Sequence, residues 1–387
     1  MRFRGGNRID LLGNGEQFFP ALEREIDAAR HEIHLETYIF EDDATGHRIA
    51  QALLRAAGRG VAVRLLVDGF GSRGFAAGLH DDFLRAGVQS LIFRPEKSLL
   101  KFRRTRLRRL HRKLAVIDGS VGFCGGINII DDLYSGGPEY PRFDYAVRVQ
   151  GPLVADMHAT VRNVWTRAAW THMRPRWAEV FREAPIPSAA GACRAALVVR
   201  DNFRHRHDIE RAYLTAIRNA ESEVIIANAY FLPGKRFRRA LRRARERGVR
   251  VVLLLQGRME YLLVHYATRA LYHQLLEAGV EIHEYQRSFL HAKVAVVDGR
   301  WATVGSSNID PVSLLLAREA NVFVESEAFA GELRRSLQAA ISSGATLVDR
   351  GYAAHIGWWN RFASWTAYAL LRTLTGISSY GRARDFL

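Results

Sequence analysis

Residues 111–119, His-Arg-Lys-Leu-Ala-Val-Ile-Asp-Gly, decide the interpretation of this chain because they have a second copy. Residues 291–299 read His-Ala-Lys-Val-Ala-Val-Val-Asp-Gly, so both stretches have the form His-x-Lys-x4-Asp-Gly. The composition predicts far fewer than one chance match to this pattern. The apolar run in each copy favours a buried β-strand. A glycine-containing turn that ends in asparagine follows each copy, at 125–128 and 305–308.

Lysine is rare in this chain, which makes its place in both motifs informative. Five of the 56 Lys and Arg residues are lysines, and two of the five are Lys113 and Lys293. Residues two apart on a strand face the same side, so each lysine shares a face with His111 or His291. Imidazole can act as a nucleophile or proton donor near neutral pH, and an ammonium group can neutralise an anionic oxygen. The pattern therefore predicts chemistry on a phosphate rather than two surface strands of a duplicated scaffold.

The doubled motif resembles that of the phospholipase D superfamily, which is defined by paired His-x-Lys-x4-Asp motifs. Within it, the chain is most similar to bacterial cardiolipin synthases of the shorter type without N-terminal membrane helices. The resemblance covers most of residues 8–325. The narrower similarity rests on Leu-Glu-Thr-Tyr-Ile-Phe at 35–40, Gly-Gly-Ile-Asn at 125–128, Asp131, Asp132, Tyr134, Phe-Asp at 143–144 and Gly-Pro at 151–152.

The order of predicted elements also repeats. A helix near 18–29, a strand at 32–40, a helix at about 46–57 and a strand at 61–67 are matched by a helix at 209–220, a strand at 223–230, a basic helix within 234–250 and a strand at 251–255. We predict an α/β fold of two tandem phospholipase D-like α-β-α repeats, each a mixed sheet flanked by helices. The resemblance implies that the repeats pack about a pseudo-twofold axis, which places both motifs in one cleft.

Composition changes suggest the limits of the repeats. The Pro/Ala/Gly/Ser-rich stretch at 184–191 has the character of a linker. We expect an N-terminal repeat at 1–185 with the first motif, a C-terminal repeat at 192–345 with the second, and an amphipathic tail at 346–387. In the tail, Trp, Tyr and Leu recur at helical spacing beside Arg361 and Arg372, which favours a membrane-surface helix over a helix that caps the core.

The resemblance assigns catalytic roles to both motifs. One histidine attacks phosphorus and becomes phosphorylated, and the other protonates the leaving alcohol and then deprotonates the incoming one. We assign the nucleophile to His111 and the acid/base to His291, and the near-symmetry of the motifs leaves the reverse assignment open. The groups expected to hold the phosphoryl oxygens are Lys113, Lys293, Asn128 and Asn308.

A catalytic imidazole needs its second nitrogen fixed by an acceptor, usually a carboxylate. The family supplies an acidic residue some thirty positions after each histidine, and Asp144 fits the first half and Glu319 the second. A surface carboxylate is the alternative interpretation of each. Asp118 and Asp298 precede glycine at a strand end, so we assign them to structure, as turn formers or internal ion pairs.

Differences between the repeats suggest where the substrate binds. The candidates are Tyr38, Tyr230, Glu36, Gly126 and Ser306. The two tyrosines stand at matching strand ends and either line the cleft or are repeated core aromatics. Glu36 has Asn228 as its counterpart, which favours a head-group pocket at Glu36. Gly126 has Ser306 as its counterpart, which implies that the two half-sites have different roles in the reaction.

The net charge of +16 and the pI near 10.3 imply an anionic partner. In the basic segment at 97–113, leucines lie between the Lys and Arg residues, which suits an anionic lipid surface next to His111. We therefore expect anionic phospholipids and a membrane surface as partners, and not nucleic acid. Cys124 and Cys193 indicate neither a disulfide framework nor a metal cluster, and we expect both to be reduced and buried. We predict no metal and no cofactor.

The chain has no apolar run typical of a signal peptide at its start and no clean apolar window of about 18 residues. We expect it at the bacterial cell membrane, bound peripherally on the cytoplasmic side. The predicted function is that of a cardiolipin synthase, which transfers a phosphatidyl group from phosphatidylglycerol to a second phospholipid through a phosphohistidine and releases glycerol. The alternatives are a hydrolytic phospholipase D and, from another class, a phosphodiesterase nuclease. The oligomeric state stays open.

Overall fold

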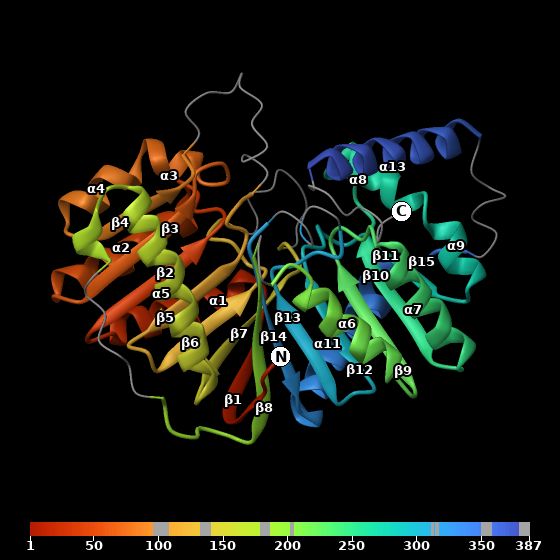
Figure 1. Cartoon of the computed structure of the whole chain (residues 1–387), viewed down its shortest axis with the longest axis horizontal. Helices are drawn as coiled ribbons and strands as arrows, with labels where there is room; N and C mark the ends of the chain where they lie inside the picture. The colour runs from red at the N-terminus through yellow and green to blue at the C-terminus, as the bar shows by residue number, and fades with distance from the viewer. Residues whose placement is uncertain are drawn as a thin grey trace.

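The computed structural model describes residues 1–95, 108–131, 141–178, 186–201, 205–310, 313, 317–349 and 358–378. A fifteen-stranded sheet runs through the molecule, in the order β15-β11-β10-β9-β12-β13-β14-β8-β1-β7-β6-β5-β2-β3-β4, and helices cover it (Figure 1). β1 and β8 pair at its centre, and the order β1-β7-β6-β5-β2-β3-β4 on one side matches β8-β14-β13-β12-β9-β10-β11 on the other. The predicted α/β repeats are confirmed, and their two sheets are joined edge to edge.

The first repeat contains a parallel group of strands and an antiparallel group. β2, β3 and β4 are parallel, whereas β5, β6 and β7 pair antiparallel, with β5 also antiparallel to β2. The elements are β1 (Arg4–Gly13), α1 (Asn14–Ala28), β2 (Glu32–Thr37), α2 (Ala44–Gly58), β3 (Ala62–Asp68), α3 (Arg73–Ala77), α4 (Leu79–Arg85), β4 (Gln89–Phe93), β5 (Lys113–Ile117), β6 (Val121–Gly125), β7 (Tyr145–Gln150), α5 (Leu153–Thr171) and a 3-10 turn, η2 (Pro175–Trp177).

The second repeat has the same pairing and extends further. Its elements are β8 (Cys193–Arg200), α6 (Asp208–Arg218), β9 (Glu223–Asn228), α7 (Lys235–Glu246), β10 (Arg250–Gln256), α8 (Leu262–Arg269), α9 (Tyr272–Glu277), β11 (Glu281–Tyr285), β12 (Lys293–Val297), β13 (Trp301–Gly305), β14 (Glu319–Glu325), α11 (Glu327–Gly344), β15 (Ala345–Leu347) and α13 (Trp358–Ser378). The predicted helices are correct to within a few residues. The two strands predicted through Phe40 and Tyr230 end earlier, at Thr37 and Asn228.

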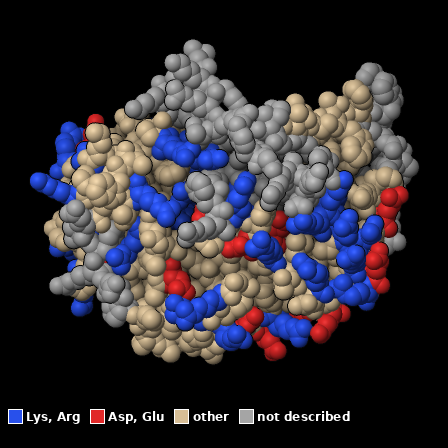
Figure 2. Space-filling view, viewed as in Figure 1, with Lys and Arg blue, Asp and Glu red and all other residues tan. Residues whose placement is uncertain are grey.

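Local sequence explains these elements. In α1, Phe18, Leu22 and Ile26 recur every four residues and are buried against the sheet. The carboxylate of Asp43 caps α2 by accepting the N–H of Gly46. The basic run at 234–250 is largely α7, an outer helix that buries its apolar face and leaves its arginines on the surface. Figure 2 shows them as a dense basic group over this part of the second repeat.

The two repeats share a central core. It contains buried residues from β5, β6 and β7 of the first repeat and from β12, β13 and β14 of the second, with α5 and α11 beside them. The long helix at the end of each repeat also reaches the first strand of the other, since α5 contacts β8 and α11 contacts β1. This shared core fixes one repeat against the other. Cys124 lies buried in it, as predicted, whereas Cys193 is only half-buried, and both thiols are free.

The predicted boundaries need adjustment at the C-terminal end. Residues 186–192 have no regular structure and lead into β8, while 184 and 185 lie outside the described residues. β15 pairs with β11, so the sheet of the second repeat continues to Leu347. α13 packs on α8, and its Ala367 and Tyr368 are part of the core of the second repeat. Among the described residues, no helix is long and apolar enough to cross a membrane.

The motif aspartates lie at matching turns after β5 and β12. Asp118 and Asp298 have positive φ angles of 49° and 52°, which short polar side chains tolerate best after glycine. The Asp118 carboxylate accepts the N–H groups of Arg30, His31 and Glu32, and thereby holds the start of β2. Asp298 accepts the equivalent N–H groups of residues 221–223 before β9. This geometry supports the assignment of both aspartates to turn formation.

We expect Asp118→Ala to lower the free energy of unfolding by about 2 kcal/mol, because three N–H groups lose their acceptor and alanine is strained at positive φ. Asp298→Ala should have a similar effect in the second repeat. Urea denaturation measures both. The matched control is Asp27→Ala, which removes an exposed ion pair with Arg55 and should cost less than about 1 kcal/mol. Equal losses in all three variants would contradict the structural role.

Candidate active site

Backbone hydrogen bonds connect each motif to the opposite repeat. The N–H of His111 donates to the carbonyl of Arg318 over 3.0 Å, and the N–H of His291 donates to the carbonyl of Phe143 over 2.8 Å. Each acceptor residue directly precedes one of the predicted acidic residues, Glu319 or Asp144. The two motifs and the two carboxylates therefore meet at the junction between the repeats.

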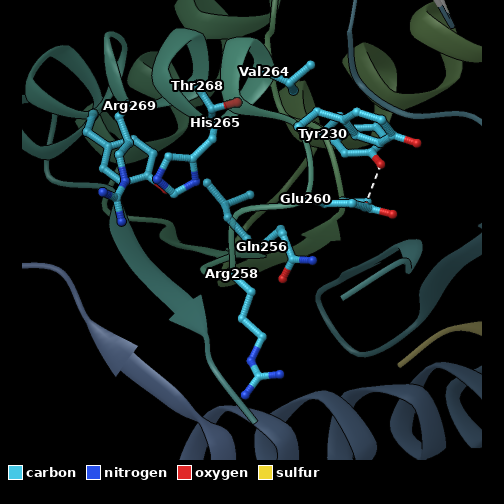
Figure 3. Close-up of a pocket in the computed structure, with 12 residues that line it drawn as sticks. Tyr230, Gln256, Arg258, Glu260, Val264, His265, Thr268 and Arg269 are labelled. Atoms are coloured by element: carbon cyan, nitrogen blue, oxygen red, sulfur yellow. Dashed lines mark hydrogen bonds between the residues drawn. The ribbon is translucent and has the colours of Figure 1, made fainter. Parts of the chain in front are cut away.

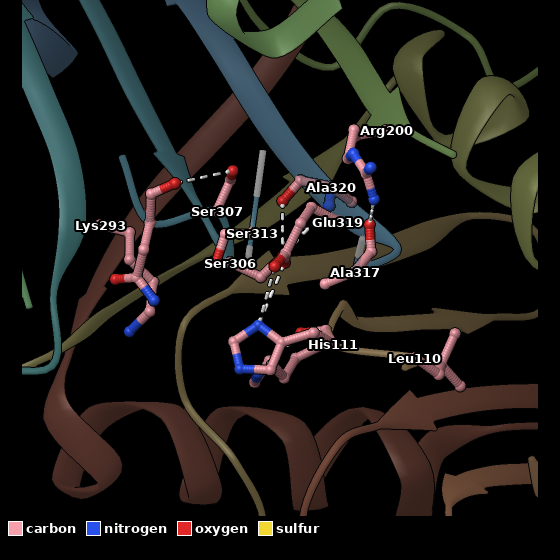
Figure 4. Close-up of polar contacts among 12 residues, drawn as sticks. Leu110, His111, Arg200, Lys293, Ser306, Ser307, Ser313, Ala317, Glu319 and Ala320 are labelled. Atoms are coloured by element: carbon pink, nitrogen blue, oxygen red, sulfur yellow. Dashed lines mark hydrogen bonds and ion pairs between the residues drawn. The ribbon is translucent and has the colours of Figure 1, made fainter. Parts of the chain in front are cut away.

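Each imidazole is held by a carboxylate of the other repeat. The Nδ1 of His111 lies 3.0 Å from Oε1 and 3.2 Å from Oε2 of Glu319 (Figure 4). The Nδ1 of His291 lies 2.6 Å from Oδ2 of Asp144. The sequence suggested that each carboxylate serves the histidine of its own half, Asp144 with His111 and Glu319 with His291. This pairing is wrong. Because Nδ1 faces the carboxylate in both cases, Nε2 is the nitrogen available for chemistry.

The environments of the two carboxylates explain why Gly126 and Ser306 differ. The hydroxyl of Ser306 donates to Oε2 of the fully buried Glu319 over 2.5 Å. At the equivalent place in the first repeat, a Cβ on Gly126 would overlap the carboxylate of Asp144. Gly126 and Ser306 therefore shape the carboxylate partners of the histidines. Their prediction as substrate-binding residues is corrected accordingly.

The motif lysines lie close to the histidines, as their spacing predicts. The Nζ of Lys113 donates to the carbonyl of His111 over 2.7 Å, and the Nζ of Lys293 donates to the carbonyl of His291. Burial lowers the pKa of Lys113 to about 7 and that of Lys293 to about 8. An anion bound here would oppose this effect by stabilising both ammonium groups. The site is therefore suited to receiving an anionic group such as a phosphodiester.

The pKa values of both histidines are lowered. Burial is the main cause at His111 and at His291, and the charges of Lys113 and Lys293 add to it at both. Burial also raises the pKa of Asp144 to about 6. Neutral imidazoles with Nε2 unprotonated can attack phosphorus, and a bound anion favours adding a proton to one of them.

The two asparagines flank the site in different ways. The Oδ1 of Asn128 accepts the N–H of Ile39 over 3.1 Å, so this oxygen helps to fix the loop after β2. The Oδ1 of Asn308 is buried and has no hydrogen-bond partner among the described residues. Both side chains are nearly inaccessible, 5 % and 2 % exposed. Their role in holding phosphoryl oxygens stays a prediction.

The predicted substrate residues Tyr38 and Tyr230 lie next to the histidines. The ring of Tyr38 packs against that of His111, with centroids 4.8 Å apart, and the Nζ of Lys113 lies over it. The N–H of Ala229 donates to the carbonyl of Ala292, so the residue before Tyr230 and the residue after His291 are joined by a backbone hydrogen bond. Both tyrosines are half-buried, and Tyr230 lines a pocket with Glu260.

Glu36 does not belong to a substrate pocket. It is 3 % exposed, and Arg112 donates to both of its carboxylate oxygens. Arg112 stands between His111 and Lys113 on the chain, so it faces the other side of the strand. Glu36 and Arg112 form a buried ion pair beneath α5, and the prediction of Glu36 as a head-group residue is wrong.

The sequence interpretation missed Arg142 and Glu260. Arg142 lies two residues before Asp144, and its Nη2 is 3.5 Å from Oε1 of Glu260. Oε2 of Glu260 accepts the hydroxyl of Tyr230 over 2.7 Å. The sequence held a signal for Glu260. Arg-Gly-Val occurs at 59–61 and again at 247–249, and the same offset of 188 residues pairs Glu260 with Ser72, which has no charge.

One group among the described residues has metal-ligand spacing, and it lies outside the site. Glu32, His34 and His158 place their ligand atoms within 4.8 Å of one another. The guanidinium of Arg64 already lies 2.9 Å from the Glu32 carboxylate. Because a resident cation balances the carboxylate, we assign the group to an internal ion-pair network under α5.

Comparison with known proteins agrees with this geometry. A family model described as cardiolipin synthase, PLD-like domain, matches residues 22–156 and 213–341. The chain belongs to this family. It is 42 % identical over 372 residues to cardiolipin synthase B of Shigella flexneri, covering 96 % of this chain and 89 % of that protein, and equally to cardiolipin synthase B of Escherichia coli K12. A cardiolipin synthase of Geobacillus thermodenitrificans is 34 % identical, covering 81 % of this chain and 62 % of that protein.

The crystal structure of phosphatidylserine synthase from Haemophilus influenzae has the same fold as this member of the cardiolipin synthase family. The TM-score is 0.69 at 14 % identity, with 95 % of this chain and 93 % of that one covered. At this level of identity the likeness concerns the fold alone. It agrees with the two-repeat architecture described above.

We expect Gly126→Ala to reduce phosphodiester turnover about 100-fold, because the added methyl displaces Asp144 and with it the ring of His291. The melting temperature should fall by only a few degrees. The control is Gly58→Ala at the end of α2, where a Cβ meets open space. Turnover of both variants is measured beside the wild type. Full activity of Gly126→Ala would show that the position of Asp144 is not critical.

The buried lysines predict a specific pH dependence of stability. With a folded-state pKa of about 7 against the ordinary 10.5, Lys113 binds fewer protons in the folded than in the unfolded chain between these values. The free energy of unfolding should therefore rise from pH 7 to 9, by up to about 1.4 kcal/mol per pH unit for each such group. Lys113→Met should flatten the rise, whereas Lys235→Met on exposed α7 should not. Urea denaturation in phosphate-free buffer tests this, and a flat wild-type profile would contradict it.

Proposed function

We propose that this protein is a cardiolipin synthase that transfers a phosphatidyl group from phosphatidylglycerol to a second phosphatidylglycerol. The observation that carries the proposal is the pair of His-Lys sets at one junction, each imidazole supported by a carboxylate of the other repeat. Phospholipid as the substrate class is supported by the named relatives, which are cardiolipin synthases at 42 % identity over 96 % of this chain.

In the first step, Nε2 of His111 attacks phosphorus and the bond from phosphorus to the glycerol oxygen breaks. That oxygen takes the Nε2 proton of His291, so glycerol leaves and a phosphatidyl-His111 remains. Lys113 and Lys293 stabilise the charge on the phosphoryl oxygens, with Asn128 and Asn308 as additional donors. The side chain of His111 is 19 % exposed and that of His291 is 9 % exposed, which supports His111 as the more accessible nucleophile.

In the second step, the glycerol hydroxyl of another phosphatidylglycerol attacks the same phosphorus. Its proton passes to Nε2 of His291 and the phosphorus–nitrogen bond to His111 breaks, which releases cardiolipin and restores both histidines. Water in place of that hydroxyl would give phosphatidic acid, the product of a hydrolytic phospholipase D. The buried surroundings of both imidazoles favour transfer because they limit the access of water.

We also propose that the protein binds the membrane surface through the outer faces of α8 and α13. The two helices pack together and expose Tyr261, Leu262, Phe362 and Trp365, all by more than half. Figure 1 shows both helices on one side of the second repeat. Most of the basic segment at 97–113, residues 97–107, lies outside the described residues. Peripheral attachment on the cytoplasmic side remains our proposal, and protease protection in spheroplasts would test it.

The decisive assay uses purified protein with anionic vesicles that contain labelled phosphatidylglycerol. We expect cardiolipin and free glycerol from the wild type, and a loss of at least about 1000-fold in His111→Ala and His291→Ala. Lipid separation quantifies the products. The same vesicles measure flotation of the protein, which Phe362→Asp with Trp365→Asp should weaken.

Other products would change the conclusion. Phosphatidic acid without cardiolipin would make the protein a hydrolase. Labelled single-stranded DNA serves as a control substrate. Cleavage of the DNA without lipid turnover would show that the protein is a phosphodiesterase nuclease instead. The matched negative control is His273→Ala, an exposed histidine on α9 whose loss should leave turnover unchanged.

A further inference from the structure

Each half-site has a carboxylate where the other has an uncharged residue: the first has the fully buried Asp68, and the second has the partly exposed Glu260. Leu110 and Leu290, which precede the motif histidines, donate their N–H groups to Asp68 and Gln256, so these two positions correspond. Four residues further on, Ser72 corresponds to Glu260. Ser72 is fully buried, and its hydroxyl is used by the backbone of Tyr38 and Phe40. Glu260 instead lines a pocket together with Tyr230.

Glu260 is connected to the second motif rather than the first: it contacts Tyr230 and Arg142, and its charge acts on Lys293. Its carboxylate accepts the hydroxyl of Tyr230, and Arg142 lies against its other oxygen. Tyr230 is joined to the second motif through the bond from Ala229 to Ala292, and Arg142 is two residues from the carboxylate that holds His291. Figure 3 shows the polar ends of Tyr230 and Glu260 directed away from His265 and Arg269, which lie on the other side of the pocket.

A carboxylate in this place does not help to bind phosphate. It repels a phosphodiester, and its contact with Arg142, at 3.5 Å, is too long for a strong hydrogen bond. A carboxylate is, however, the strongest acceptor that a side chain offers to neutral hydroxyl groups. The side chain of Glu260 is 19 % exposed, so a ligand can reach it. Tyr230 adds a phenol oxygen as a second acceptor.

We propose that Glu260 and Tyr230 bind the vicinal hydroxyl groups of the glycerol that leaves or enters beside His291. This inference rests on the proposed function, in which His291 exchanges its proton with that glycerol. The entering alcohol attacks from the position that the leaving glycerol occupied, so the hydroxyl next to its attacking one meets the same two residues. Glu260 is then a specificity-determining residue that selects an alcohol with adjacent hydroxyl groups over a simple alcohol or water.

The test compares two alcohol acceptors in vesicles of phosphatidylglycerol. Labelled glycerol enters phosphatidylglycerol by exchange, and labelled ethanol enters phosphatidylethanol. We expect Glu260→Gln to lower kcat/KM for glycerol by about tenfold or more while ethanol transfer changes less than about threefold, since ethanol has no second hydroxyl to lose. Tyr230→Phe should shift the same ratio in the same direction, by a smaller factor. The control, Glu277→Gln, alters an exposed carboxylate on α9 and should change neither value.

The outcomes separate this inference from the proposed function. An unchanged ratio in Glu260→Gln, or an equal loss with both alcohols, would overturn the polyol site while wild-type transfer still supports the synthase. A wild type that transfers phosphatidyl groups to no acceptor would overturn the proposed function itself. If the wild type makes cardiolipin but uses neither soluble alcohol, the ratio of cardiolipin to phosphatidic acid decides, and it must fall in Glu260→Gln.

Discussion

The active site depends on a hydrogen bond that crosses between the repeats, from Nδ1 of each imidazole to a carboxylate of the other half. Glu319 begins β14 and serves His111, while Asp144 directly precedes β7 and serves His291. Neither repeat can orient its own histidine alone. The β1–β8 junction and the shared core are therefore part of the catalytic apparatus, because they set the position of each carboxylate relative to the opposite ring.

The junction between the repeats also buries several ionisable groups away from water. Lys113 and Lys293 donate to main-chain carbonyls, and burial lowers the pKa of both. Desolvation of these ammonium groups disfavours the folded state, and an anionic substrate reverses part of that effect. The scarcity of lysine elsewhere in the chain fits this special use of an amine whose pKa can shift.

Much of this could be predicted from the sequence, because a strand fixes which residues share a face. The His-x-Lys spacing placed each lysine next to its histidine, and the repeat of elements predicted the two halves. The cross-repeat pairing could not be predicted, since Asp144 and Glu319 have the same spacing along the chain whichever histidine they serve. The ion pair of Glu36 could also be predicted from the sequence. Where the first repeat has Glu36 and Arg112, the second has Asn228 and Ala292, so the two charges are present or absent together, as in an ion pair.

The differences between the repeats fall into two kinds. Gly126 and Ser306 each fit the carboxylate next to them: glycine leaves room for the carboxylate of Asp144, and serine supplies a hydroxyl to Glu319. Glu36 with Arg112 is balanced in the same way, since the two charges neutralise each other in a buried place. Such differences preserve the geometry of the site, and they do not favour one orientation of the substrate over the other.

Glu260 is of the other kind. Its counterpart is an uncharged serine that serves the backbone, and the contact with Arg142 does not fully neutralise its carboxylate. A partly exposed carboxylate at one end of a nearly symmetric site makes the two histidines inequivalent toward a substrate. A phosphodiester has two different ester oxygens, and the end that carries neutral hydroxyl groups is better placed beside the carboxylate. In our proposal, Glu260 favours one orientation of the substrate and thereby supports His291 as the acid/base.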